Sequence, residues 1–168
     1  MTTVTRAFDD LLAANRTFAG SFELAGFDGV AHAGVAVVTC MDSRIDPLGM
    51  LGLEPGDAKI LRNPGGRVTE GALDALVLAV HLLGVNRILV VPHTQCAMAT
   101  YTENELCDMV SASSGQDASW QSFCVVGDQV ASLRKDVRKV RSHPLIANTV
   151  AVGGFMYDVH TGLVEQMF

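Results

Sequence analysis

Two short stretches of the sequence concentrate side chains that bind metal ions. His93 and Cys96 stand three positions apart in HTQC, and Cys40 opens CMDSR. Imidazole and thiolate are the ligands that zinc most often takes in proteins, and a catalytic zinc site supplies three protein ligands and leaves the fourth position open. A pair of ligands three residues apart is a weak signal, so the prediction of a zinc site depends on Cys40 as the third ligand. The alternative is that both cysteines are core thiols and that His93 is a hydrogen-bonded loop residue.

Two charged residues, Asp42 and Arg44, directly follow Cys40. A carboxylate and a guanidinium are costly to bury unless each has a partner. They either take part in the same site or form a local ion pair that caps a turn. The remaining cysteines, Cys107 and Cys124, belong to no motif and are predicted to be core thiols rather than disulfide partners, because nothing in the chain indicates export to an oxidising compartment.

The elements that must position these residues can be read from the apolar pattern. Strands are predicted at 34–40, 58–62, 87–92, 149–159 and 163–168. Alternation of such strands with helices predicts right-handed crossovers and a mostly parallel sheet, and ligands collect at the carboxyl ends of its strands. We therefore expect an α/β fold with a mostly parallel four-stranded central sheet flanked by helices, and a short C-terminal edge strand. Cys40 ends the first strand and HTQC follows the third, so both fall at that edge.

Helical spacing predicts four helices, at 4–19, 70–83, 97–110 and 120–141, with a polar loop at 111–119. Thr69 is the expected N-cap of the second helix, which ends near Gly84. A glycine-bearing stretch separates the first helix from the rest. We expect a single domain over 1–168, in which residues 1–33 form an N-terminal helical arm that packs on a partner subunit.

Composition narrows the class of protein further. The chain has 168 residues, of which 49% are hydrophobic and 18% charged, and its net charge is −6. The densest basic run, RKDVRKVR at 134–141, has helical spacing and predicts a solvated helix face, so no nucleic-acid partner is expected. No signal peptide and no apolar run of about 18 residues is apparent, which predicts a soluble, cytoplasmic protein without a membrane partner.

Three motifs, in this order and separation, closely resemble those of the β-class carbonic anhydrases. They are CMDSR at 40–44, RNPGG at 62–66 and HTQC at 93–96. The helix LLAANRTFA and the ending GGFMYDVHTGLVE are also similar to that family, so the resemblance covers nearly the whole chain. It implies a zinc ion held by Cys40, His93 and Cys96, with water or hydroxide as the fourth ligand. It also implies that Asp42 and Arg44 form a dyad.

The resemblance implies the reversible hydration of carbon dioxide to bicarbonate and a proton, by attack of a zinc-bound hydroxide that the dyad orients. It also implies a homodimer or homotetramer in which the arm embraces the partner. Two alternatives remain open: hydrolysis of carbonyl sulfide or carbon disulfide on the same zinc site, and a catalytically weak zinc- or anion-binding homologue.

The sequence departs from the family pattern at two positions. Ala97 follows the second cysteine of HTQC, where the family has glycine, and alanine resists the backbone conformations that glycine allows. Pro64 stands where alanine is common and removes one backbone N–H beside the site. The histidines outside the motifs, His81, His143 and His160, are expected to be structural or solvated rather than proton shuttles.

Overall fold

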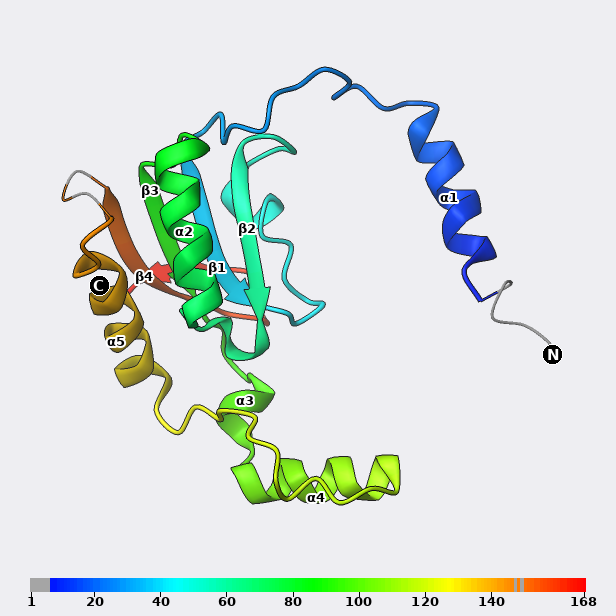
Figure 1. Cartoon of the computed structure of the whole chain (residues 1–168), viewed down its shortest axis with the longest axis vertical. Coiled ribbons are helices and arrows are strands. Elements are labelled where there is room, and N and C mark those ends of the chain that lie inside the picture. The colour runs from blue at the N-terminus through cyan, green and yellow to red at the C-terminus, as the bar shows by residue number, and fades with distance from the viewer. Residues whose placement is uncertain (1–6, 147, 149) are drawn as a thin grey trace.

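One twisted sheet organises the molecule, and the computed structural model describes residues 7–146, 148 and 150–168 of the chain (Figure 1). The strands are β1 (Val35–Cys40), β2 (Ala58–Asn63), β3 (Arg87–Val91), β4 (Ala151–Tyr157) and β5 (Val164–Gln166). Their order in the sheet is β2-β1-β3-β4-β5; the first four are parallel and β5 is antiparallel to β4. The predicted α/β class is confirmed, with the short C-terminal strand at the edge. Residue 149, the first position of the strand predicted at 149–159, lies outside the described residues.

Strand β1 lies in the middle of the sheet because its side chains are apolar on both faces. All six of its residues are buried, as expected of a central parallel strand covered on both sides. Val38 pairs with Leu61 of β2 and with Val90 of β3 in register. This pairing brings the carboxyl ends of β1 and β3 side by side.

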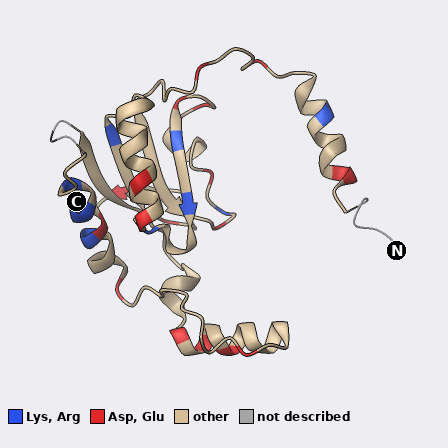
Figure 2. Ribbon diagram, viewed as in Figure 1, with Lys and Arg blue, Asp and Glu red and all other residues tan. Residues whose placement is uncertain are grey.

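Two helices cover one face of the sheet, α2 (Glu70–Leu82) and α5 (Gln129–Arg141). Their apolar side chains form one core cluster with residues of β1 and β3, which includes Leu76, Leu133, Val137, Val38 and Val90. Thr69 caps α2 by accepting a hydrogen bond from the backbone N–H of Ala72, as predicted. The exposed residues Arg134, Lys135 and Arg138 give α5 a basic outer face (Figure 2), in agreement with the predicted solvated face.

The opposite face is covered by the segment that contains the short 3-10 helix η1 (Gly49–Leu51). Its core cluster includes Val37, Ile45, Val91 and Tyr157. Ile60, Leu89 and Phe155 on this face are only partly buried in the single chain.

Two of the predicted helices were placed wrongly. The predicted helix at 97–110 is two helices, α3 (Ala97–Thr100) and α4 (Glu103–Ser114), because Thr102 and Glu105 form a capping box that begins a new helix. Helix α4 therefore runs into the predicted loop at 111–119.

The predicted helix at 120–141 begins only at Gln129. Asp128 caps it by accepting a hydrogen bond from the backbone N–H of Ala131. The irregular segment before it is held by Glu103, whose carboxylate accepts hydrogen bonds from the backbone N–H groups of Phe123 and Val125.

Helix α1 (Asp9–Ala19) lies apart from the sheet at the end of an extended linker (Figure 1). None of its residues is buried. The large apolar side chains of this segment, Phe8, Leu11, Leu12 and Phe18, are each more than half exposed. Residues 4–6 of the predicted helix lie outside the described residues. No helix among the residues described is long and apolar enough to cross a membrane.

Candidate metal centre

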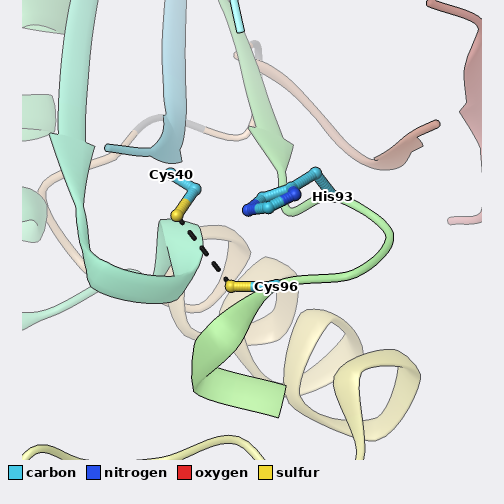
Figure 3. A group of neighbouring side chains, drawn as sticks. All are labelled: Cys40, His93 and Cys96. Atoms are coloured by element: carbon cyan, nitrogen blue, oxygen red, sulfur yellow. Dashed lines mark hydrogen bonds between the residues drawn. The ribbon is translucent and has the colours of Figure 1, made fainter. Parts of the chain in front are cut away.

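The three predicted zinc ligands meet at the carboxyl end of the sheet. Cys40 is the last residue of β1, and His93 and Cys96 follow the end of β3. Because Thr39 pairs with Val91, these two strand ends are neighbours. The ligand atoms of the three buried residues all lie within 4.8 Å of one another, and Figure 3 shows the two sulfurs and the imidazole turned toward a common point.

The donor geometry fits a zinc ion. The two sulfurs are 3.9 Å apart, and two thiolates at about 2.3 Å from a tetrahedral zinc would be about 3.8 Å apart. His93 Nδ1 bonds the carbonyl oxygen of Thr94 at 2.8 Å, whereas Nε2 is the one buried side-chain nitrogen or oxygen among the described residues that has no hydrogen-bond partner. A ring with one nitrogen fixed by a carbonyl and the other left free is the usual arrangement of a metal-binding histidine.

A hydrogen bond between the two sulfurs shifts the pKa values of the two thiols in opposite directions. The pKa of Cys40 is lowered to about 4, chiefly because the Cys96 thiol donates a hydrogen bond to its sulfur, although burial acts in the opposite direction. The pKa of Cys96 is raised because it is that donor and is buried. Burial, the largest single influence, disfavours the imidazolium of His93, but Cys40, the Thr94 carbonyl and Asp42 together raise the pKa of the ring.

The metal-free protein is therefore expected to keep one thiolate at Cys40 in weakly acidic solution. Since the folded-state pKa is lowered, the thiolate is present at neutral pH and is lost as the pH falls through about 4. The measurement is thiolate absorbance near 240 nm, taken as the difference between the metal-free protein and its Cys40→Ser variant. A difference that disappears already above pH 7 would contradict this ionisation.

Asp42 and Arg44 form the predicted pair beside the three ligands. Arg44 Nε donates to Asp42 Oδ1 at 3.0 Å and its terminal nitrogen donates to Oδ2 at 2.8 Å. The backbone N–H of Arg44 also donates to Oδ1, at 2.9 Å. These bonds hold the pKa of Asp42 well below its usual range. Asp42 Oδ2 lies 3.7 Å from His93 Nε2, so the ionised carboxylate borders the metal centre while Arg44 holds it.

A second arginine, Arg62 at the end of β2, supports the chain around Asp42. Its Nε donates to the carbonyl oxygen of Cys40 at 2.9 Å, and its terminal nitrogen donates to that of Asp42 at 2.5 Å. Arg62 opens the motif RNPGG, which was the available signal for this residue, but no role for its side chain was predicted.

The two departures from the family pattern leave the centre intact. Pro64 opens the 3-10 turn η2 (Pro64–Gly66), and the next residue, Gly65, donates its backbone N–H to Cys40 Sγ at 3.3 Å. Ala97 is exposed and begins α3 without a positive φ, so the strain that an alanine would suffer in a glycine conformation does not arise. The residue of HTQC with positive φ is Gln95, at 55°.

Gly66 of the same turn is predicted to tolerate no side chain. Its φ is 64°, and a Cβ there would lie 3.0 Å from the backbone nitrogen of Cys40 and the carbonyl carbon of Thr39. We expect Gly66→Ala to destabilise the protein by about 2 kcal/mol or more, because left-handed strain and a backbone clash add together. Gly71→Ala in α2 is the control: nothing lies within 4 Å of its Cβ position, and it should gain roughly 0.5–1 kcal/mol. Urea unfolding of both variants measures the difference, and equal stabilities would contradict the prediction.

Comparisons with known proteins agree with this geometry. A family model described as "Carbonic anhydrase" matches residues 35–122, which include all three motifs. Beta-carbonic anhydrase 1 of Mycobacterium tuberculosis is 30% identical over 159 residues, which are 95% of this chain and 96% of that protein. A carbon disulfide hydrolase of Acidianus sp. is 33% identical, over 74% of this chain and 72% of its own length. The solved carbonic anhydrase structure from Streptococcus mutans superposes with a TM-score of 0.86 at 36% identity, over 100% of both chains.

Proposed function

This chain belongs to the β-carbonic anhydrase family, and from that premise we propose that it catalyses the reversible hydration of carbon dioxide to bicarbonate and a proton. The observation that carries the proposal is the convergence of Cys40, His93 and Cys96, with an ionised Asp42 at their border.

Cys40, His93 and Cys96 would hold zinc with three protein ligands and leave its fourth position open. When bound, zinc lowers the pKa of a water ligand toward 7 and so supplies a nucleophile at neutral pH. The backbone N–H of Gly65 stabilises the negative charge of the Cys40 thiolate.

Asp42 accepts a hydrogen bond from the reacting water. This bond orients the water so that a lone pair of the water oxygen points at carbon dioxide. This role requires a carboxylate that is ionised and fixed in place. Arg44 meets both requirements, because its two side-chain bonds and one backbone bond keep Asp42 charged and oriented. Arg44 also draws the carboxylate away from the ligand cluster, which keeps the fourth position accessible.

The rest of the proposal concerns the assembly and location of the protein. We propose a single cytoplasmic domain that forms a homodimer or homotetramer, with residues 1–33 packed on a partner subunit. The exposed apolar side chains of α1 support this, because a helix with that composition gains stability only when another surface covers it. Removal of residues 1–33 is expected to lower the mass found by light scattering to that of a monomer.

A second candidate function is the hydrolysis of carbon disulfide on the same centre, favoured by the similarity to the Acidianus enzyme. Stopped-flow hydration of carbon dioxide between pH 7 and 9, on protein of measured zinc content, tests the first proposal. Release of hydrogen sulfide from carbon disulfide tests the second in parallel. Carbon dioxide hydration supports the first. Sulfide release without hydration favours the hydrolase, and bound zinc with neither activity identifies a catalytically weak homologue.

A further inference from the structure

Helix α5 contacts the segment that carries His93 and Cys96, and also the residues that follow the turn beside Cys40. Gln129, its first residue, donates from Nε2 to the carbonyl oxygen of His93 at 2.9 Å. Asp136, seven residues later and so on the same face of the helix, accepts hydrogen bonds from Arg67 and Val68, which directly follow the turn η2. One helix thus contacts the strand end that bears His93 and the turn that contacts Cys40.

Asp136 is an unusual residue for its surroundings. It is 4% exposed and lies between the buried residues Leu133 and Val137. Its Oδ2 accepts from Arg67 Nε at 2.6 Å and from the backbone N–H of Val68 at 3.2 Å, and its Oδ1 accepts from Arg67 at 3.1 Å. A buried ion pair contributes little net stability compared with apolar residues of similar size, so stability alone does not explain this one.

The turn that Asp136 anchors is closed at its base by Asn63. The Asn63 side chain accepts from the backbone N–H of Arg67 at 2.8 Å and donates to its carbonyl oxygen at 2.7 Å. Within the turn that Asn63 and Arg67 close, the backbone N–H of Gly65 donates to Cys40 Sγ, and Gly66 packs against the backbone of Cys40. A small cavity adjoins both contacts of α5, and Gly65, Gln129 and Asp136 are among the residues that line it.

We propose that Gln129 and Asp136 are positioning residues for the metal centre, through which α5 holds His93 and the Gly65 turn in the geometry that zinc requires. The inference rests on the proposed function only for the identity of the metal. Residues that orient metal ligands without touching the metal typically change metal affinity by about 10- to 100-fold when replaced.

The experiment measures zinc dissociation from the full-length protein into a chromogenic chelator, at a temperature well below the melting temperature of every variant. Asp136→Asn keeps the shape of the side chain and removes its charge, and is expected to raise the dissociation rate by about 10-fold. Gln129→Met is expected to raise it roughly threefold or more, because the partly exposed Gln129 makes one neutral hydrogen bond. Absorption spectra of the cobalt-substituted proteins should shift in both variants.

Glu70→Gln is the matched control, since it breaks a different ion pair of α5, the one between Lys139 and the first residue of α2. Glu70 Oε1 lies 2.5 Å from Lys139 Nζ, and its exposed carboxylate does not contact the turn. Its zinc dissociation rate and cobalt spectrum are expected to match those of the wild type. If Glu70→Gln releases zinc as fast as Asp136→Asn, general stability explains the effect and the proposal is wrong.

Folded Asp136→Asn protein with a dissociation rate within about twofold of the wild type would overturn the proposal. If that variant does not fold, Gln129→Met decides the question, and an unchanged rate and spectrum overturn it. Zinc content and carbon dioxide hydration of the wild type distinguish failure of this inference from failure of the proposed function. Stoichiometric zinc without carbon dioxide hydration refutes the function and leaves the positioning test valid, whereas a wild type that binds no zinc refutes both.

Discussion

Asp42→Ala is expected to lower the rate of carbon dioxide hydration by about 100-fold or more, the usual size of a lost proton-handling group, while zinc stays bound. Asp42 is not one of the three clustered ligand residues, so its removal leaves the donor set complete. It does remove the carboxylate that borders the centre at 3.7 Å from His93 Nε2. Stopped-flow kinetics on protein of measured zinc content would show both effects.

Asp42→Asn is the control for the local backbone. Asparagine can still accept the backbone N–H bond that Arg44 donates to Asp42 Oδ1, so the turn is kept while the negative charge is lost. We expect this variant to be as inactive as Asp42→Ala. Full activity in either variant, at full zinc content, would show that the carboxylate has no part in the reaction.

Cys40→Ser is expected to abolish stoichiometric zinc binding, and hydration activity with it. A serine hydroxyl is not ionised at neutral pH and is a poor zinc ligand, so two protein ligands would remain. With free zinc at about 1,000 times the wild-type Kd, the loss of binding also removes about 4 kcal/mol of stability. Atomic spectroscopy after dialysis and thermal unfolding with and without zinc measure the two effects.

Cys124→Ser is the matched control because Cys124 does not belong to the ligand cluster. Cys107 is buried as predicted, but the prediction that Cys124 is a core thiol was wrong, since its side chain is exposed. The Cys124→Ser variant should retain one zinc per chain and full activity. Wild-type zinc affinity in Cys40→Ser would exclude Cys40 as a ligand.

The sequence was most informative where local pattern and chemistry coincide. The uniformly apolar, β-branched run at 34–40 can be buried only in the centre of a sheet, and β1 is there. Cys40 ends this run and His93 directly follows the run at 87–92, so parallel pairing was sufficient to predict that they meet. Both predictions, the central place of β1 and the meeting of Cys40 with His93, depend only on the pattern of a few consecutive residues.

The contacts that could not be predicted join residues far apart in the chain. Arg67 and Asp136 are separated by 69 positions, and Gln129 and His93 by 36. Nothing in the local sequence of α5 distinguishes Asp136 from a solvated residue, and RKDVRKVR indeed predicted a solvated face. The break between α3 and α4 was missed for a different reason: the apolar spacing continues through it, and the capping box of Thr102 and Glu105 outweighs that spacing.

The position of the ligands also bears on how the chain folds. Cys40 and Cys96 are 56 positions apart, and they meet because β1 pairs with β3. In the unfolded chain only His93 and Cys96 are close, so the complete donor set forms after the two central strands have paired. Bound zinc then acts as a cross-link that closes a long loop across the middle of the sheet, and its binding free energy adds to the stability of that pairing. Loss of the metal therefore weakens the centre of the fold as well as the reaction.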